Sequence, residues 1–343
     1  MNVTKKYQKA LSILKCIECG SNKLIDSEEN CLLKCRNCGT HYHVIRGIPR
    51  FVPYSYFNLD EGKNSIEEKT KNYFGFEWKE FEKWGFFNDE EISKEQKVEF
   101  FGGTISARKA AFDSKCRIDK EELVEGNIVL DAGCGNGRYT YEAAIRGKAT
   151  VVGVDIGYGS VESAFKNNLK NDNVIIIQAS LFKLPFNKNV FDASFSNGVL
   201  MHTGDAKKAF YEIAKTIKPN GTFVAHVYHK LNPIWEFNDY ILRSITTRLS
   251  VKQNMFFAAL MAKLGKLINK SKYLSLFANL FFRIQPTVIH MYDWYSAPIA
   301  THHTYSELAG WFKSCNFELL DNIPHVGLFK RPWAINLKGR KIG

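Results

Sequence analysis

Four cysteines near the start of the chain form two matched pairs with the spacing of a metal site. Cys16 and Cys19 are separated by two residues, as are Cys35 and Cys38, and 15 residues lie between the pairs. A glycine follows the second cysteine of each pair, where a tight turn needs a residue that tolerates positive φ. Two such pairs supply four thiolates for tetrahedral zinc, and four sulfurs leave no open position for catalysis. We therefore predict a structural Zn²⁺ ion.

Two histidines, His41 and His43, follow the second pair and are alternative ligands, although the matched cysteine pairs are the simpler set. A module of about 50 residues has a marginal core of its own. Structural zinc supplies roughly 10–16 kcal/mol in comparable modules. The other four cysteines lack partners at metal spacing, so we expect them to be small buried apolar groups.

A glycine-rich segment in mid-chain has the composition of a nucleoside-binding loop. Gly133, Gly135 and Gly137 follow an apolar run that ends in Asp131, and the next apolar run ends in Asp155. Glycines let the backbone pass close to a ligand, and the start of the following helix offers free N–H groups. The first carboxylate suits a ligand with a cationic amino-acid end, and the second can accept both ribose hydroxyls.

Two common nucleotide motifs are absent. A dinucleotide fingerprint would need glycine at position 138, which is arginine. No Gly-Lys-Ser or Gly-Lys-Thr sequence occurs, so the loop is not a P-loop.

The elements that position these residues follow from the alternation of apolar runs and helix-period segments after residue 126, which is typical of βα units around a parallel sheet. A segment with helical spacing and no strand signal covers residues 233–284. We predict strands over 128–130, 150–154, 174–178, 191–196, 221–227 and 317–320, and helices over 138–146, 161–169, 206–217 and 305–314.

Composition and length fit a globular protein of two domains, or of one large domain with an appendage. The chain has 343 residues, of which 45% are hydrophobic and 24% charged. The longest stretch without Lys, Arg, Asp or Glu has 13 residues, whereas a spanning helix needs roughly 18 or more. The sequence begins without an apolar signal region. We therefore expect a cytoplasmic protein whose thiols are free or bound to metal.

Residues 126–230 resemble the class I S-adenosylmethionine-dependent methyltransferase domain of the methyltransferase type 11 kind. The matching segments are the first motif (129–137), the second motif (151–155), the adenine-contacting segment (178–186), the fourth strand and its loop (191–203) and the turn before the fifth strand (217–221). The N-terminal module, with residues 47–51, is similar to the zinc ribbon of tRNA-methyltransferase activator subunits. Residues 73–78 and 292–304 resemble segments of a bacterial subgroup with this layout.

The resemblance implies an α/β fold with a doubly wound, mostly parallel seven-stranded sheet. It implies a zinc ribbon over 1–53, a helical linker or cap over the cofactor site at 54–125, and a methyltransferase domain over 126–343 with a helical insertion at about 232–290. The implied cofactor is S-adenosylmethionine. At position 180 the family usually has an aspartate that binds the adenine amino group, and Ser180 carries no charge. The implied cofactor contacts are Asp131, Gly133, Gly135, Gly137, Asp155, Ile156, Ser180, Leu181 and Asn197.

Methyl transfer from a sulfonium is an in-line displacement, so positioning dominates over acid–base chemistry. Positioning supplies roughly 7–11 kcal/mol of such a barrier, whereas a general base contributes roughly 10²–10⁴-fold. For a hydroxyl acceptor, His202 is the first candidate base because it follows the fourth strand, and a structural role in that loop is the alternative. The next candidates are His229, His302 and His303.

Aromatic residues are frequent, and two interpretations of them stay open. Phe74, Trp78, Tyr292 and Tyr295 could pack over the sulfonium or the acceptor, since rings favour cations. At this density, aromatic side chains are more often part of the core.

The net charge of +12 is concentrated in one segment. Between Tyr240 and His290 lie eight Lys and Arg residues and no Asp or Glu. We favour a helical insertion that caps the active site, and contact with an anionic membrane is a second interpretation. RNA binding is a third, but the aromatic residues lie within apolar runs and not beside the cations, which disfavours it.

These observations favour a methyltransferase that modifies a hydroxyl of a small-molecule or glycan-type acceptor, with an anionic acceptor compatible with the basic segment. This predicts an enclosed, aromatic-lined pocket beside His202. An RNA methyltransferase is the alternative, and it predicts a basic groove from residues 1–50 to the cofactor cleft. A non-catalytic partner-binding protein is a further alternative.

Overall fold

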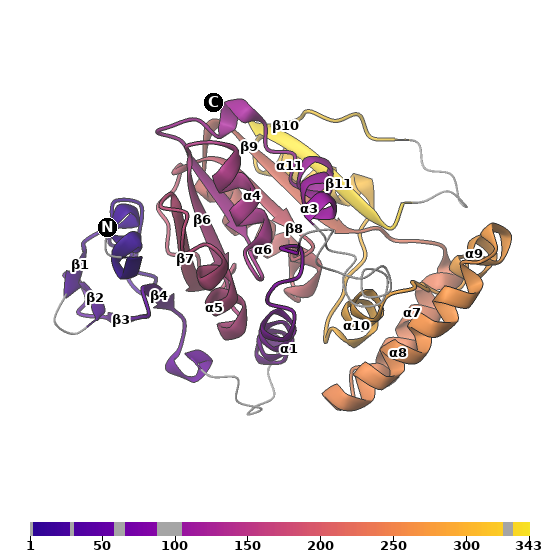
Figure 1. The fold of residues 1–343 in the computed structure, drawn as a ribbon. Coiled ribbons are helices and arrows are strands. Elements are labelled where there is room, and N and C mark those ends of the chain that lie inside the picture. The colour runs from indigo at the N-terminus through magenta and orange to yellow at the C-terminus, as the bar shows by residue number, and fades with distance from the viewer. Residues whose placement is uncertain (1–2, 28–30, 58–65, 88–104, 325–331) are drawn as a thin grey trace.

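A computed structural model describes residues 3–27, 31–57, 66–87, 105–324 and 332–343 (Figure 1). Its framework is one sheet of eleven strands in the order β1-β2-β3-β4-β7-β6-β5-β8-β9-β11-β10. The strands are β1 (Leu24–Ser27), β2 (Leu32–Cys35), β3 (His41–Ile45), β4 (Ile48–Phe51), β5 (Ile128–Ala132), β6 (Thr150–Asp155), β7 (Val174–Ala179), β8 (Phe191–Asn197), β9 (Ile217–Tyr228), β10 (Phe317–Leu319) and β11 (Ala334–Lys341).

The seven strands from β7 to β10 form the doubly wound sheet expected from the sequence. Strands β7, β6, β5, β8 and β9 pair in parallel, and β11 is antiparallel to both β9 and β10. The parallel strands are buried on both faces, which is why they read as continuous apolar runs. The prediction of a mostly parallel seven-stranded sheet is confirmed.

Alternate residues of these strands belong to two cores on opposite faces of the sheet. Val129 and Val151 pack with α3 (Ile105–Ala111), α4 (Arg138–Arg146) and α5 (Tyr158–Asn167). Leu130 and Val152 pack with α6 (Ala206–Thr216) and α11 (Tyr305–Ser314). Helix α1 (Ile66–Glu80) lies against α5 near the carboxyl ends of the strands (Figure 1).

The N-terminal module continues the sheet. Strands β1 to β4 form an antiparallel meander, and β4 then pairs in parallel with β7, with Arg50 opposite Gln178 and Phe51 opposite Ala179. The short 3₁₀ helix Val3–Ala10 contributes Tyr7 to the same core as α6. A second 3₁₀ turn, Tyr54–Phe57, follows β4.

Helices α7 (Pro233–Thr246), α8 (Val251–Ile268) and α9 (Lys272–Asn279) protrude from the sheet, and α10 (Val288–Ser296) packs between them and the main body (Figure 1). A third core joins α7, α8 and α10 through Trp235, Ala258, Met291 and Tyr295. Within the described part of the chain, no helix is both long and apolar enough to cross a membrane.

Two elements, β11 and α10, were not predicted from the sequence. In β11, Gly339 lies directly against the ring of Phe312, and a Cβ at this position would be only 2.6 Å from the ring. Lys338 is buried and binds Asp119 at 2.7 Å. A strand with a buried lysine and a glycine lacks an alternating apolar pattern, so its pairing with β9 is set by tertiary contacts.

Candidate active site

A cavity of about 400 Å³ opens at the carboxyl ends of β5, β6, β8 and β9. The glycine loop and residues 180–182 line one part of it. Helix α1 and the 3₁₀ turn Leu200–His202 line the middle, and residues from β9, β11 and the segment around α10 line the remainder. Ligands of doubly wound sheets bind at this edge.

The glycine loop is held by Asp155, which was predicted from the sequence to accept ribose hydroxyls of the cofactor. The carboxylate of Asp155 accepts the backbone N–H groups of Gly135 at 3.0 Å and Gly157 at 2.8 Å. Burial raises the pKa of Asp155, although these two N–H groups oppose the shift. Gly135 has a φ of +53°, and a Cβ there would be 2.9 Å from the indole of Trp78. The loop therefore needs glycine both for its conformation and for its contact with α1.

Two residues predicted to contact the cofactor lie behind the loop and do not line the cavity. The carboxyl of Asp131 is buried and accepts the Thr140 hydroxyl at 2.6 Å. Burial raises its pKa to about 7, although the Thr140 hydrogen bond opposes the shift. Gly137 begins α4 with a φ of +78°, and a Cβ there would be 2.8 Å from the Cα of Ala164. Both residues fix the loop against its neighbours.

The other predicted cofactor contacts come together at the cavity. Gly133, Ile156, Ser180, Leu181 and Asn197 all line it, together with Gly135 and Asp155. Asn197 ends β8, and its buried Oδ1 atom has no hydrogen-bond partner.

His202 lies in the wall of the cavity and is buried. Its Nδ1 atom is 2.5 Å from the carbonyl oxygen of Ile299. Since a carbonyl can only accept, Nδ1 carries the proton and Nε2 keeps a free lone pair. Burial lowers the pKa of His202 to about 4, so the ring is neutral at neutral pH. Its ring lies between those of Phe74 and Tyr228, with centroids 5.0 and 5.4 Å away.

The three other histidines considered from the sequence do not line the cavity. Nδ1 of His302 lies 2.7 Å from the Glu236 carboxylate. Nε2 of His303 lies 2.9 Å from the Thr301 hydroxyl. His229 contacts the carbonyl oxygen of Pro332 through Nδ1 at 2.9 Å. Their partners indicate structural roles.

Two histidines that the sequence analysis missed, His226 and His290, do line the cavity. Burial lowers the pKa of His226 to about 3, and the charges of Lys115 and Arg283 lower it further. Nδ1 of His226 is buried without a hydrogen-bond partner. Burial likewise lowers the pKa of His290 to about 4.

Three cations of the cavity wall were also missed, and they come from distant parts of the chain. Arg138 follows the glycine loop, Lys115 lies on the π-helical turn Phe112–Cys116, and Arg283 follows α9. None of the three forms an ion pair within the described part of the chain. Arg138 stands directly beside the loop, and Arg283 belongs to the basic segment predicted to cap the site, whereas Lys115 had no signal in the sequence.

The two arginines are held by aromatic rings, and each keeps a buried nitrogen without a hydrogen-bond partner. The guanidinium of Arg138 lies 3.7 Å from the ring centroid of Trp84, and its Nη1 atom is unpartnered. That of Arg283 lies 3.8 Å from the ring centroid of Trp294, and its Nε atom is unpartnered. Buried donors in this state are binding positions for acceptor groups of a ligand.

The four aromatic residues considered from the sequence divide into two pairs. Phe74 and Trp78 of α1 line the cavity. Tyr292 and Tyr295 are buried and do not line it. Tyr292 stacks on Tyr73 at 5.2 Å.

Helix α1 also brings a carboxyl group to the cavity wall, on Glu77. Its Oε2 atom is buried without a partner. Burial, with a smaller contribution from Asp293, raises the pKa of Glu77 well above its ordinary value. A raised pKa favours the protonated carboxyl, which can donate a hydrogen bond.

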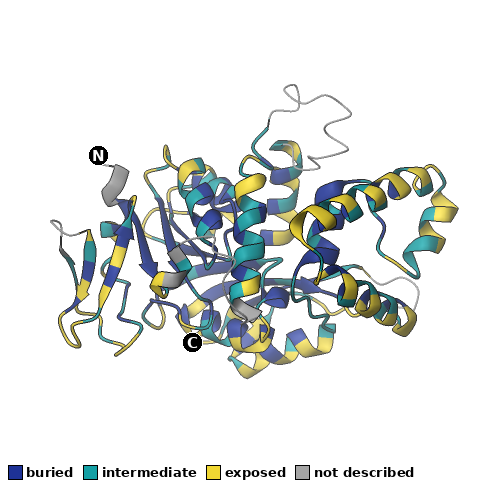
Figure 2. Ribbon diagram, turned by 90° about the horizontal axis from the view of Figure 1, so that it is seen from below, coloured by how far each residue is buried: buried dark blue, intermediate teal, exposed yellow. Residues whose placement is uncertain are grey.

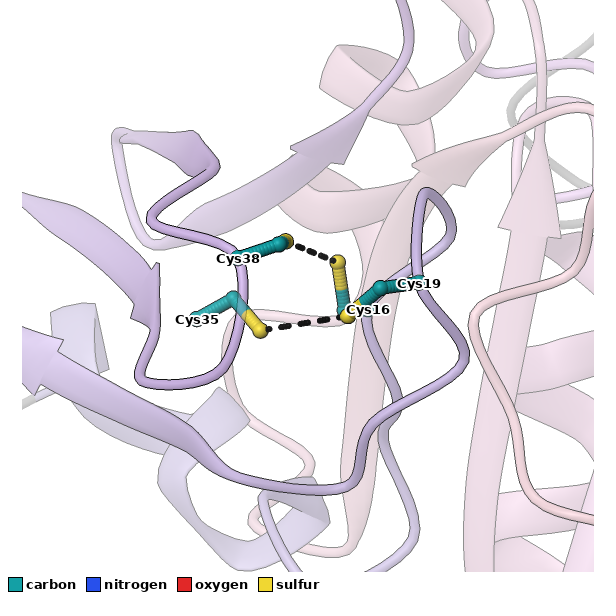
Figure 3. A group of neighbouring side chains, drawn as sticks. All are labelled: Cys16, Cys19, Cys35 and Cys38. Atoms are coloured by element: carbon teal, nitrogen blue, oxygen red, sulfur yellow. Dashed lines mark hydrogen bonds between the residues drawn. The ribbon is translucent and has the colours of Figure 1, made fainter.

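A separate cluster of Cys16, Cys19, Cys35 and Cys38 lies at the end of the N-terminal meander (Figure 3). The four Sγ atoms lie within 4.8 Å of one another, and the Cys16–Cys38 and Cys19–Cys35 pairs are 3.6 Å apart. Tetrahedral zinc with bonds of about 2.3 Å needs sulfurs about 3.8 Å apart. The donor set and spacing fit a Zn²⁺ ion.

Comparison with known proteins assigns the central part of the chain. Residues 123–276 match the model of a family described as a methyltransferase domain. This region contains the glycine loop, Asp155 and His202. Residues 123–276 are a methyltransferase domain. The predicted relationship to S-adenosylmethionine-dependent methyltransferases is confirmed.

The methyltransferase domain has relatives with different acceptors in their names. It is 30% identical over 112 residues to 24-methylenesterol C-methyltransferase 3 of Arabidopsis thaliana. The aligned region covers 32% of this chain and 31% of the relative. It is 33% identical over 104 residues to tRNA U34 carboxymethyltransferase of Ruthia magnifica, which covers 29% and 32%. This chain thus spans about a third of the length of these relatives.

Among solved structures, magnesium protoporphyrin IX methyltransferase from Synechocystis PCC 6803 with bound SAH is similar at 16% identity. The alignment covers 79% of this chain and 97% of that one, with a TM-score of 0.46.

Proposed function

We propose that this protein is an S-adenosylmethionine-dependent methyltransferase that acts on a hydroxyl of an anionic small-molecule or glycan-type acceptor. The observation that carries the proposal is a single cavity in which the glycine loop, His202 and three cations without ion pairs face a common space. We expect it to act in the cytoplasm, where cysteine thiols stay reduced and available to metal.

The residues at the loop fit the proposed cofactor, whose sulfonium would supply the methyl group. The Asp155 carboxylate accepts two N–H groups and keeps lone pairs for ribose hydroxyls. The buried, unpartnered Nη1 atom of Arg138 is a donor for a carboxylate. Asn197 and Ser180 supply polar groups to the same part of the cavity. Asp131 would contribute by fixing α4 and not by direct contact.

His202 suits the part of a general base toward the acceptor hydroxyl. Its proton is committed to the Ile299 carbonyl, so Nε2 is left to accept a proton. A ring with a pKa of about 4 is fully in the accepting form at neutral pH, though it is a weak base. Positioning in the cavity would supply most of the rate enhancement.

The charges opposite the loop favour an anionic acceptor. The Lys115 side chain reaches solvent at the cavity, yet the surrounding protein lowers the pKa of its ammonium group, and the charges of Arg138 and Arg283 lower it further. Three cations that repel one another in this way would be stabilised by a bound anion. Because Arg138 would meet the carboxylate of the cofactor, Lys115 and Arg283 remain for the acceptor.

The test is transfer of labelled methyl groups from S-adenosylmethionine into a fractionated cell extract, with and without nuclease treatment. The proposal expects labelled product in a nuclease-resistant, anionic small-molecule or glycan fraction. Loss of all label after nuclease would overturn it in favour of an RNA acceptor. Absence of cofactor binding in calorimetry, with folded and zinc-loaded protein, would favour the non-catalytic alternative.

Two variants test the anionic acceptor separately. Lys115→Met and Arg283→Met should each raise the KM for the acceptor about tenfold, because a charge-assisted contact contributes about 1.5–3 kcal/mol, and leave the Kd of the cofactor within about twofold. Lys148→Met is the matched control, since Lys148 is an exposed lysine of the same domain. An unchanged KM in both variants would contradict an anionic acceptor held there.

A further inference from the structure

The protruding helices α7, α8 and α9 have many exposed positions (Figure 2), and an unusual number of these carry large apolar side chains. Fifteen of the 22 exposed large apolar or tyrosine side chains in the described part of the chain lie between Ile234 and Phe282. Phe256 is 74% exposed and Tyr273 is 84% exposed. Scattered exposed apolar residues are normal, but a contiguous set of this size marks an interaction surface.

Helix α8 carries a stripe of large apolar residues on its outside, and its fully buried positions are small or polar. Met255, Phe257 and Met261 are partly buried against the third core. Phe256, Leu260, Leu264 and Leu267 recur at intervals of four, four and three residues and are all exposed, so they form one outward stripe. The buried positions of the helix are Asn254, Ala258, Ala262 and Gly265.

Helix α8 cannot rotate about its axis to bury the apolar stripe, because its inward face is closely packed. A Cβ at Gly265 would lie 2.4 Å from the carbonyl oxygen of Gln285, so the helix is seated closely on the segment that leads to α10. A water-facing helix normally has the opposite arrangement, with large apolar residues toward the core. The exposure of the stripe is therefore fixed by the close packing of the opposite face of α8.

Within the described part of the chain, cations border the stripe, and the segment between Tyr240 and His290 contains no acids. Lys252, Lys263 and Lys270 are exposed at positions one helical turn from residues of the stripe. The two acids of α7 are engaged inside the protein, where Glu236 meets His302 and Asp239 accepts the indole N–H of Trp294. No Asp or Glu occurs between Tyr240 and His290.

The eight cations of this segment point in two directions. Arg243 is buried and bonds the carbonyl oxygens of Trp294 and Ala297. Arg283 lines the cavity. The remaining cations lie on α8, on α9 or in the turns beside them: Arg248, Lys252, Lys263, Lys266, Lys270 and Lys272.

We propose that α7, α8 and α9 lie on an anionic lipid surface, with the apolar side chains in the interfacial region and the lysines near the headgroups. A second copy of this chain would bring two faces of the same positive sign together, which opposes pairing through this surface. An anionic bilayer matches both properties, since apolar burial and lysine–headgroup attraction add. The contact is interfacial, because none of these helices is a candidate to span a membrane. The proposal is independent of the methyl acceptor.

The test is co-sedimentation of the full, zinc-loaded chain with lipid vesicles. We expect at least tenfold stronger binding to vesicles of phosphatidylcholine with phosphatidylglycerol than to phosphatidylcholine alone, and weaker binding at high salt. Phe256→Ser combined with Leu260→Ser should reduce binding at least tenfold. Lys263→Gln combined with Lys270→Gln should reduce it roughly 25-fold, at about fivefold per cation.

Ile145→Ser combined with Lys148→Gln provides the matched control, since both residues are exposed on or beside α4, away from these helices. This variant should bind as the parent does. Calorimetry with S-adenosylmethionine or, failing that, an unchanged thermal transition establishes that every variant is folded. Binding to neither type of vesicle would overturn the proposal, as would equal losses in the control. The proposal would also be overturned if sedimentation detected a dimer that dissociates in the Phe256→Ser/Leu260→Ser variant, and if vesicle binding were absent.

Discussion

At the scale of single residues, the site depends on side chains whose charge is set by burial. Burial lowers the pKa of His202 to about 4, so its ring is neutral at neutral pH, and burial raises the pKa of Glu77 well above its ordinary value. Asp155, in contrast, has its carboxylate oxygens committed to backbone N–H groups of the loop. One cavity therefore contains a carboxyl group that can donate a hydrogen bond (Glu77), an imidazole nitrogen that can accept a proton (His202) and a carboxylate that can accept hydrogen bonds from hydroxyl groups (Asp155).

His202→Asn is the direct test of the proposed base. The shorter amide can still donate toward the Ile299 carbonyl but cannot accept a proton, so kcat should fall by about 10²-fold or more while KM changes little. The measurement is steady-state transfer of labelled methyl groups to the acceptor fraction. His302→Asn, which alters a histidine outside the cavity, should lower kcat less than threefold. Comparable losses in the two variants would indicate a structural role for His202.

The low pKa of His202 also predicts a dependence of stability on pH. The folded ring has a pKa of about 4, against about 6.5 in an unfolded chain. Between these values the unfolded chain binds a proton that the folded protein excludes, so stability is lost as the pH falls. From pH about 6.5 to about 5, this histidine alone should cost about 2 kcal/mol.

Urea unfolding of the parent and of His202→Asn at both pH values measures this difference. The free energy of unfolding of the variant should fall by about 2 kcal/mol less than that of the parent over the same interval. His41→Asn, at an exposed position, serves as the control and should follow the parent. Parallel curves for all three proteins would show that the ring is not kept neutral by its surroundings.

At the scale of secondary structure elements, α1 closes the cofactor part of the cavity. Trp78 packs on Gly135, and its carbonyl accepts the hydroxyl of Ser163 in α5 at 3.0 Å. Tyr73, one turn earlier, donates to the carbonyl of Tyr292 at 3.0 Å. The helix is thus fixed at one end to α5 and at the other to α10.

Trp78→Ala should weaken cofactor binding about tenfold. The substitution removes the ring that covers the glycine loop, and the guanidinium of Arg138 lies over this same ring. The loss corresponds to about 1.4 kcal/mol, within the range of a partly buried cation–π contact. Isothermal calorimetry with S-adenosylmethionine measures it. Trp78→Phe keeps an aromatic ring and should bind within about threefold of the parent. Equal affinity of the alanine variant and the parent would contradict a covering function for α1.

Elements with local signals were predictable, and those fixed by distant contacts were not. Helix α11 matches its predicted range because Thr304 and Glu307 form a capping box at its start. The glycine loop was predictable because its conformation depends on glycine itself. Lys115, by contrast, comes to the cavity through a π-helical turn that no pattern in the sequence marks. For Arg283, the basic segment indicated a charged cap, but not which of its cations would reach the cavity.

Asp131 shows that the position of a residue in a sequence motif does not determine where its side chain lies. Its position before the glycines predicted a ligand contact, yet Thr140 binds its carboxyl in the interior. Sequence spacing placed the residue at the correct strand end but did not determine on which side of the loop the carboxyl lies.

At the scale of the whole molecule, the N-terminal module is connected to the cofactor site by a chain of buried hydrogen bonds. Arg50 of β4 donates to Gln178 Oε1 at 2.8 Å. The amide nitrogen of Gln178 donates to the carbonyl of Ile156 at 2.8 Å, and Ile156 directly follows Asp155. Arg50 also pairs with Glu162 of α5.

Removal of the proposed zinc ion should therefore weaken cofactor binding. If the module loosens, Gln178 loses a buried partner, which costs about 1–3 kcal/mol and corresponds to a loss of about tenfold in affinity. The measurement is calorimetry with S-adenosylmethionine before and after treatment with a chelator, with metal analysis of the protein. A chelator already saturated with zinc is the control and should have no effect. Unchanged affinity after complete loss of the metal would show that the module acts independently of the site.

The parallel pairing of β4 with β7 has a further consequence for the integrity of the protein. In a sheet of this order, β7 would be an outer strand if the N-terminal module were absent, and its six residues are all buried. An uncovered, mostly apolar strand with free backbone groups is a template for aggregation. The four cysteines would thus protect solubility as well as local structure: we expect chains made without enough zinc, or lacking β1 to β4, to self-associate through β7 before they lose the rest of the fold.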